Sequence, residues 1–245
     1  MQNLYAPALI FLQPSISGLT FSVEELDNLL GGLRLGEFVV FRGSWMCHVL
    51  SELLCVRSQL PYAEGGLDST VVFIDGGNIF DPYFISETAR QFSLNPEETL
   101  MNIWISRAFT GYQLTALITE ELPKILDRNG SRLVVISDIA TLYCDPDIGA
   151  MEAKRTFNHI TRSLWELAKQ RNIILVATSL SAQSERKRRL EHYLLGRASV
   201  AAKIDAGNPH EKITLEKHPF KPMASVKLFF NEPEDQPLLE DFMEV

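Results

Sequence analysis

Hydrophobic and polar positions follow two different patterns along the first three quarters of the chain. Short apolar runs rich in β-branched and aromatic residues alternate with longer segments whose apolar residues recur at helical spacing. The short runs cover residues 37–41, 69–75, 100–106, 132–137 and 172–179, and the helical segments lie near residues 46–60, 82–93, 111–128 and 150–171. Strands that are apolar on both faces and alternate with helices are typical of a parallel sheet covered on both sides. The pattern predicts an α/β fold with a mostly parallel central sheet flanked by helices.

The pattern changes from about residue 198 onward. Three runs there are shorter and alternate more strictly between apolar and polar residues, at 198–205, 211–218 and 224–230. Alternation of this kind is typical of half-buried strands, so we expect an antiparallel extension of the sheet at the C-terminal end. The predicted domain organisation is a single core at residues 18–230. A linker or oligomerisation strand at 1–17 precedes the core, and an acidic tail at 231–245 follows it.

Composition is that of an ordinary globular protein, with 46% hydrophobic and 22% charged residues in 245. No apolar run reaches the ~18–20 residues that a membrane span needs, and the N-terminus lacks the basic region of a secretory signal. Three cysteines, Cys47, Cys55 and Cys144, occur without C-x-x-C spacing. They predict free thiols, no metal site and an intracellular protein, cytoplasmic in a prokaryote or nuclear in a eukaryote.

Charge is distributed unevenly along the chain. The formal net charge is −8, but residues 231–245 hold six acidic and no basic residues, which leaves about −2 for the rest. Against this nearly neutral background four cations are consecutive, and a fifth follows eight residues later: Arg186, Lys187, Arg188, Arg189 and Arg197. Such a run is either a solvated loop or a surface for phosphates.

Several segments together resemble the core of the RecA/RadA recombinase family. They are LDNLLGG and SQLP within residues 26–61, RAF at 107–109, DIATLYCDPDIG at 138–149 and SLSAQ at 179–183. The resemblance covers about residues 18–230 and depends on the order and spacing of these segments. It implies a RecA-like fold with a nucleotide site at the ends of the parallel strands.

The phosphate-binding loop of that family is degenerate here. Active members carry G-x-x-x-x-G-K-[ST], in which glycines let backbone amides surround the phosphates, the lysine binds them and the hydroxyl holds Mg²⁺. Alignment without gaps puts Phe41 and Met46 at the glycine positions, Cys47 at the lysine and His48 at the hydroxyl. The loop therefore lacks the residues that hold nucleotide.

Three further positions of the family are replaced. Gly77 stands where active members have the glutamate that polarises water, and Ser137 stands at the aspartate that holds Mg²⁺. Asp138, one residue later, should point to the other face of the strand unless a bulge turns it back. Ser179 replaces the glutamine that senses the γ-phosphate. The resemblance thus implies a pseudo-ATPase that needs no cofactor and no metal.

The family also suggests where DNA would bind. Recombinases carry a flexible DNA-facing loop after the strand that ends in SLSAQ, and Arg186 to Arg189, with Arg197, fall there. We expect salt-sensitive contacts to single-stranded or junction DNA. The other loop equivalent offers Lys154 and Arg155 but opens with two aspartates, so it is the weaker candidate.

Partner contacts have two candidates. Tyr5 and Ala8 form a Y-x-x-A pattern that resembles the F-x-x-A strand by which recombinases add to a neighbour's sheet. Alternatively, Tyr5 covers the chain's own core. Trp45, in the former phosphate loop, either fills the empty cleft or projects into a partner. Trp104 and Trp165 are expected in the core.

Two functions remain open from the sequence. The first is a non-catalytic recombinase paralogue, which binds DNA and either another paralogue or the recombinase itself and supports homologous recombination and repair. Such a chain would resemble the ATPase-dead subunits of recombination-mediator assemblies. The helical DNA-binding domain of full-length recombinases has no room before this core, so duplex binding would come from the core or a partner. The alternative is a nucleotide-sensing or weakly hydrolysing RecA/KaiC-superfamily regulator, which Asp75, Asp138 or His48 near a phosphate would favour.

Overall fold

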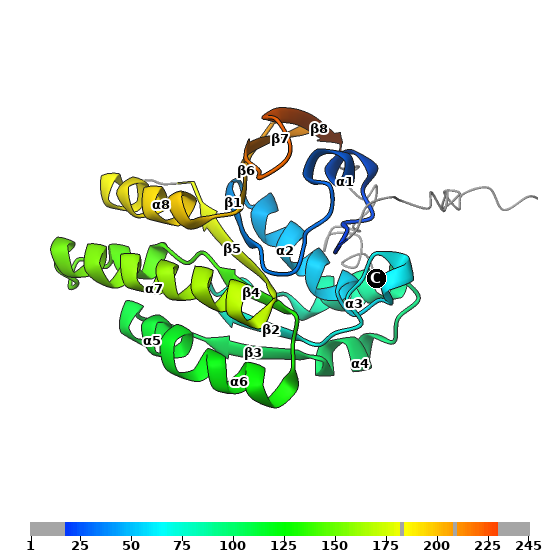
Figure 1. Ribbon diagram of the computed structural model, residues 1–245, viewed down its shortest axis with the longest axis horizontal. Coiled ribbons are helices and arrows are strands. Elements are labelled where there is room, and N and C mark those ends of the chain that lie inside the picture. The colour runs from blue at the N-terminus through cyan, green and yellow to red at the C-terminus, as the bar shows by residue number, and fades with distance from the viewer. Residues whose placement is uncertain (1–17, 182–183, 208–209, 230–245) are drawn as a thin grey trace, which may run out of the picture.

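All eight strands of the computed structural model belong to one sheet, which confirms the predicted mostly parallel architecture (Figure 1). The structure describes residues 18–181, 184–207 and 210–229. The spatial order is β3-β2-β4-β5-β1-β6-β7-β8. The strands are β1 (Phe38–Gly43), β2 (Val71–Asp75), β3 (Ile103–Arg107), β4 (Leu133–Ser137), β5 (Ile174–Leu180), β6 (Val200–Asp205), β7 (His210–Lys217) and β8 (Ala224–Phe229).

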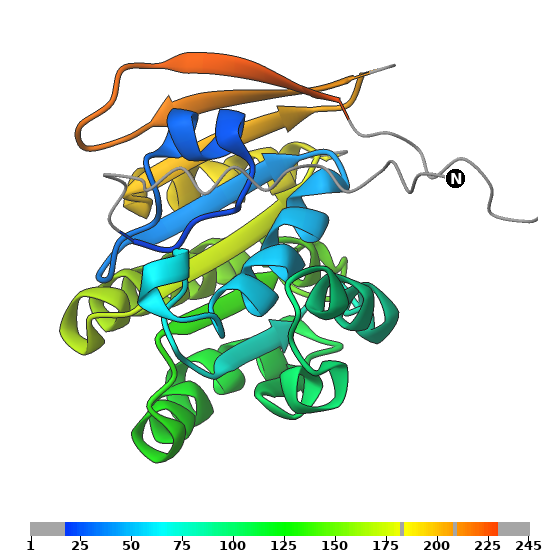
Figure 2. The same ribbon diagram turned by 90° about the vertical axis from the view of Figure 1, so that its right-hand side faces the viewer.

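The antiparallel extension begins one strand later than the sequence pattern predicts. β6 pairs in parallel with β1 on one side and antiparallel with β7 on the other, and β7 pairs antiparallel with β8. These C-terminal strands, orange in Figure 2, lie together at one end of the sheet. β6 alternates in sequence yet is buried along most of its length, because it continues the covered parallel part.

Helices cover both faces of the sheet, as predicted. They are α1 (Glu24–Leu30), α2 (Met46–Arg57), α3 (Pro82–Gln91), α4 (Pro96–Met101), α5 (Gly111–Ala116), α6 (Leu122–Asn129), α7 (Ala150–Arg171) and α8 (Glu185–Arg197), with a π-helical turn at Leu117–Glu121 joining α5 to α6. The caps are readable in the sequence: Asp81 and Asn95 accept hydrogen bonds from the first amides of α3 and α4, each followed by proline. The sequence pattern had not indicated α1, α4 or α8. No helix of the described residues combines the length and apolarity that a membrane span requires.

Alternate residues of the buried strands divide the interior into two cores. Val39 and Phe41 of β1 face one core, with α1 to α4, whereas Phe38 and Val40 face the other, with α5 to α8. This is the consequence of side chains pointing to opposite faces at successive strand positions. Figure 1 shows the two helical layers on either side of the sheet.

Two tryptophans that we expected in the core lie at the surface. Trp104 is 54% exposed because β3 is the edge strand, where Ile105 is also exposed. Trp165 on α7 is 37% exposed. The prediction was wrong for both residues. Strand order, which apolar runs do not reveal, accounts for Trp104 but not for Trp165, which lies on a helix.

Gly43 ends β1 in a conformation that only glycine adopts readily. Its φ is +119°, and a Cβ atom there would lie 2.0 Å from the carbonyl oxygen of Ile204 on β6. The next residue holds β1 close to β6 at this point, since the Ser44 amide donates to the same Ile204 carbonyl at 2.8 Å. The strand-to-helix connection therefore depends on a missing side chain.

Replacing Gly43 should weaken the fold more than an ordinary surface change. We expect Gly43→Ala to lower the free energy of unfolding by about 2 kcal/mol or more, from backbone strain and the carbonyl contact. Urea unfolding followed by circular dichroism measures it. Gly196→Ala is the matched control: nothing lies within 4 Å of its added Cβ, so helix propensity should raise stability by up to about 1 kcal/mol. Equal effects of the two variants would contradict the role of Gly43.

Candidate functional site

The carboxyl ends of β1, β2, β4 and β5 form the edge at which the sequence places a nucleotide site. Only Ser44 and Trp45 separate β1 from α2. The amides of this connection are already bonded: Ser44 N–H donates to Ile204, Met46 N–H to the Ser44 hydroxyl at 3.2 Å, and His48 N–H to the Trp45 carbonyl at 2.9 Å. A phosphate site at a helix N-terminus needs amides that are free to donate. These three have protein acceptors instead.

The side chains next to this connection favour cations rather than anions. Ser44 donates through its hydroxyl to Glu211 at 3.0 Å, so a carboxylate lies beside the start of α2. Arg42, near the end of β1, is paired with Glu216, to which its Nε donates at 2.8 Å. An incoming phosphate would meet a carboxylate and find the guanidinium already paired.

The replaced loop residues are part of the core. Cys47 is fully buried, and burial raises the pKa of its thiol, so it cannot supply charge. His48 is also buried; its Nδ1 lies 3.1 Å from the Thr178 hydroxyl, and its Nε2 has no hydrogen-bond partner among the described residues. Burial lowers the pKa of His48 and keeps it neutral. Phe41 packs edge-on against Phe21. Met46, half-buried, packs on the same core.

The space around the lost base is filled. The Gly77 amide donates to the Ser137 hydroxyl at 3.0 Å, and that hydroxyl donates to Asp75 at 2.8 Å. A Cβ atom on Gly77 would lie 3.1 Å from Asp138 Cβ. Arg107 pairs with Asp75 at 3.0 Å, so this buried carboxylate is neutralised within the chain. A glutamate at position 77 would require its neighbours to move.

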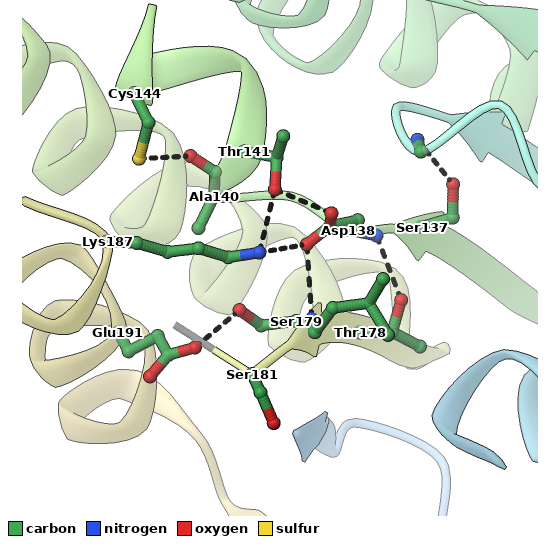
Figure 3. Close-up of polar contacts among 12 residues, drawn as sticks. Ser137, Asp138, Ala140, Thr141, Cys144, Thr178, Ser179, Ser181, Lys187 and Glu191 are labelled. Atoms are coloured by element: carbon green, nitrogen blue, oxygen red, sulfur yellow. Dashed lines mark hydrogen bonds and ion pairs between the residues drawn. The ribbon is translucent and has the colours of Figure 1, made fainter. Parts of the chain in front are cut away.

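Asp138 turns towards α8 rather than towards the former phosphate loop (Figure 3). Its φ of 38° lies in the left-handed region. Its carboxylate accepts from Lys187 Nζ at 2.9 Å, from the Leu180 amide at 3.2 Å and from the Thr141 hydroxyl. Both members of the ion pair are buried. Lys187 thus neutralises the one carboxylate that directly follows the metal-ligand position.

Ser179, at the position of the γ-phosphate sensor, also contacts α8. Its hydroxyl donates to Glu191 at 2.8 Å. Glu191 is buried, and burial raises its pKa above the ordinary value. A second polar contact therefore joins β5 to the same helix that carries Lys187 (Figure 3).

The basic run lies on a helix, where a flexible loop had been expected. Because successive helical residues point in different directions, its four cations have separate surroundings. Lys187 is buried, and Arg186 donates to the carbonyls of Asp145 and Ile148 at 2.8 and 3.0 Å. Arg189 is exposed and paired with Glu185, and Arg188 is exposed with no ion-pair partner among the described residues. Arg197 lies at the far end of α8.

The predicted partner residues are only partly described. Tyr5 and Ala8 lie outside the described residues. Trp45 is 57% exposed and contacts His48 edge-on, with ring centroids 4.9 Å apart. It stands at the surface and does not fill a cleft. Across residues 18–181, 184–207 and 210–229, no group of histidine, cysteine and acidic residues could hold a metal ion.

The Asp138–Lys187 pair gives a direct test of how this site is built. Asp138→Asn and Lys187→Met should each lower the free energy of unfolding by roughly 3–5 kcal/mol, because each leaves an uncompensated buried charge. The double variant should be no less stable than either single variant. Urea unfolding of all four proteins measures the coupling. Simple additivity of the two losses would show that the two charges do not stabilise each other.

Comparison with known proteins agrees with the fold. A family model described as Rad51 matches residues 14–191. The chain is 30% identical over 174 residues to a DNA repair protein Rad51 homolog of Drosophila melanogaster, with 69% of this chain and 52% of that protein covered. It is 29% identical over 187 residues to DNA repair protein RAD51 homolog B of Zea mays, with 72% of this chain and 52% of that protein covered. It is 28% identical over 185 residues to meiotic recombination protein DMC1 of Saccharomyces cerevisiae, with 73% of this chain and 55% of that protein covered. The chain spans about half the length of these curated relatives. It belongs to the Rad51 family and has a RecA/RadA-type recombinase core.

Proposed function

We propose that this chain is a non-catalytic member of the family, which binds DNA and a partner and acts as an accessory factor in homologous recombination and DNA repair. The process comes from the relatives, whose names refer to DNA repair and to meiotic recombination. The partner would be another recombinase paralogue or the recombinase itself. One observation carries the non-catalytic part: the two carboxylates at the former metal edge are neutralised by the chain's own cations, Asp75 by Arg107 and Asp138 by Lys187.

Loss of nucleotide chemistry has three independent supports. No cation occupies the lysine position, since Cys47 is a buried thiol. The amides of Ser44, Met46 and His48, at and after the β1–α2 connection, are bonded within the chain. The position of the water-activating residue is Gly77, which has no side chain and little space for one. Phosphoryl transfer depends on positioning and on neutralising phosphate charge, and each support removes one of these contributions.

Fewer observations favour the nucleotide-sensing alternative than the non-catalytic function. It needs Asp75, Asp138 or His48 to face a phosphate or its metal ion. Asp75 and Asp138 have arginine and lysine partners, and His48 is buried against Thr178. This pairing favours the non-catalytic function.

DNA and partner contacts would use exposed side chains at the same edge. Arg188 and Arg189 are the outward members of the basic run, and cations on a helix can reach phosphates without reading sequence. Trp45 offers a large exposed aromatic surface next to the filled site, the type of side chain that often anchors interfaces.

The chain alone should neither bind nor hydrolyse ATP with Mg²⁺. Isothermal titration calorimetry should give no heat beyond dilution, and phosphate release should stay at the background rate. Cys47→Lys alone should restore neither binding nor hydrolysis, because the amides are still bonded within the chain and the base is still missing. An ATPase of known activity serves as the positive control. Micromolar ATP affinity in the wild type would contradict the non-catalytic function.

Arg188→Ala/Arg189→Ala should weaken binding to a single-stranded oligonucleotide. Two lost phosphate contacts should reduce the slope of log affinity against log salt by about 1.4, from roughly 0.7 per contact. Fluorescence anisotropy across a salt series measures both quantities. Arg90→Ala/Lys124→Ala removes two helix-surface cations that have local ion pairs and serves as the control for net charge. Equal slopes for all proteins would show that α8 makes no phosphate contact.

A further inference from the structure

The amino ends of the parallel strands, opposite the site described above, carry two adjoining hollows. The larger is about 650 Å³ and lies between the turn before β1, the end of α7, the end of α8 and the segment after β7. The smaller is about 350 Å³ and lies beside the amino ends of β4 and β5. Leu35 lines both. The two hollows therefore adjoin at this edge of the sheet, and we call them together the amino-edge groove.

Cations dominate the lining of this groove. Six line it in the described part of the chain: Arg34, Arg132, Lys169, Arg171, Arg197 and Lys217. Glu37 is the one acidic residue among the described lining residues, and it is buried at 6% exposure. Residues 1–230 together, these cations included, carry a net charge of only about −2, so this concentration of positive charge is local.

Five of these six cations have no carboxylate at salt-bridge distance in the described part of the chain. Arg34, Lys169 and Arg197 have no ion pair at salt-bridge distance among the described residues, whereas Arg171 pairs with Asp127. Lys217 donates to two carbonyls at the end of α8, at 3.2 Å each. Burial lowers the pKa of His218; a hydrogen bond with the Leu30 backbone raises it, and the nearby charges of Lys221 and Arg34 lower it. Burial raises the pKa of the Glu37 carboxyl, and Arg34 and Lys169 lie close enough to lower it in part. With six cations against this one buried carboxylate, the groove carries an excess of positive charge.

Exposed aromatic rings lie among the cations. Phe220 is 72% exposed, with the Arg34 guanidinium 5.1 Å from its ring centroid, and Trp165 is 37% exposed. At the smaller hollow the Arg132 guanidinium lies 5.6 Å from the ring of Tyr62, which is also exposed. Flat apolar rings beside cations are the surface on which bases stack while their phosphates are neutralised.

We propose that the amino-edge groove is a second binding site for single-stranded nucleic acid, with phosphates held by Arg34, Lys169 and Arg197 and a base stacked on Trp165 or Phe220. The inference rests on the DNA-binding part of the proposed function but uses a different surface. Helix α8 separates the two surfaces: Arg197 follows Arg189 by eight residues, roughly 12 Å along the helix axis. The structure thereby divides the predicted set of DNA-binding cations between two ends of the molecule.

The chain's own acidic residues 231–245 are another anionic segment, but they lie outside the described residues, so the choice of occupant rests on the chemistry of the groove itself. β8 ends at Phe229, which pairs with His210 of β7. This end of the β7–β8 hairpin lies on the side of the carboxyl ends of the parallel strands. The groove lies at the opposite end of that hairpin, beside Lys217 and Phe220. A free strand with regularly spaced phosphates and bases matches both the cations and the aromatic rings.

The test uses fluorescence anisotropy with a labelled oligothymidylate and the full chain. Lys169→Ala/Arg197→Ala should weaken binding roughly tenfold or more at 0.1 M salt and lower the salt slope by about 1.4. Arg90→Ala/Lys124→Ala is again the charge-matched control and should bind as wild type does. Trp165→Phe should retain the fold but lose part of the tryptophan fluorescence quenching that oligothymidylate causes in wild type. Unchanged affinity, slope and quenching would overturn the proposal.

Further arms of the same experiment separate the possible failures. If wild type binds no oligothymidylate, both the proposed DNA function and this inference fail. If only Arg188→Ala/Arg189→Ala weakens binding, DNA binding stands and the amino-edge groove is not a site for it. If polyglutamate of equal charge binds as tightly and depends on the same lysine and arginine, the groove is a site for acidic peptide and the nucleic-acid assignment is overturned.

Discussion

The buried ion pair between Asp138 and Lys187 is the interaction on which the arrangement of this site depends. It joins the end of β4 to the first turn of α8, and Thr141 hydrogen bonds to both charged side chains. Such pairs add little net stability because both charges lose water. Their effect is geometric, since breaking one leaves a charge buried without a partner. Lys187 can satisfy Asp138 only when α8 packs against the carboxyl ends of β4 and β5.

The position of α8 has consequences in both directions along the helix. Glu191, one turn after Lys187, is brought to Ser179, and Leu190 and Leu194 complete the core beneath it. Arg188 and Arg189 are thereby turned to solvent at the carboxyl edge. At the other end, Arg197 reaches the amino-edge groove. A buried cation beside the metal-ligand position therefore orients exposed cations at two separate surfaces.

Local patterns were sufficient to predict the fold but not the pairing within the site. The central strands and long helices follow from apolar runs and helical spacing, because neighbouring residues largely determine them. The edge position of β3 depends on strand order, which the sequence does not display, so the exposure of Trp104 was missed. A loop is expected at Arg186 to Arg189 from their charge and from their position after the SLSAQ strand, whereas Leu190 and Leu194 pack into the core and make the segment helical. The groove cations Arg34, Lys169, Arg197 and Lys217 come from four separate elements, so no sequence window could group them.

The contacts that fill this site also explain why restoring a single catalytic residue of the family would conflict with its surroundings. A lysine restored at Cys47 would be buried at the start of α2, with Glu211 nearby and no phosphate to neutralise. A glutamate restored at Gly77 would crowd Asp138 and Ser137, which are already held by α8 and β2. Each of these catalytic residues of active family members would thus disturb a contact that stabilises the fold of this chain. These contacts leave the exposed side chains of this edge, such as Arg188 and Trp45, available for the DNA and partner binding that we propose.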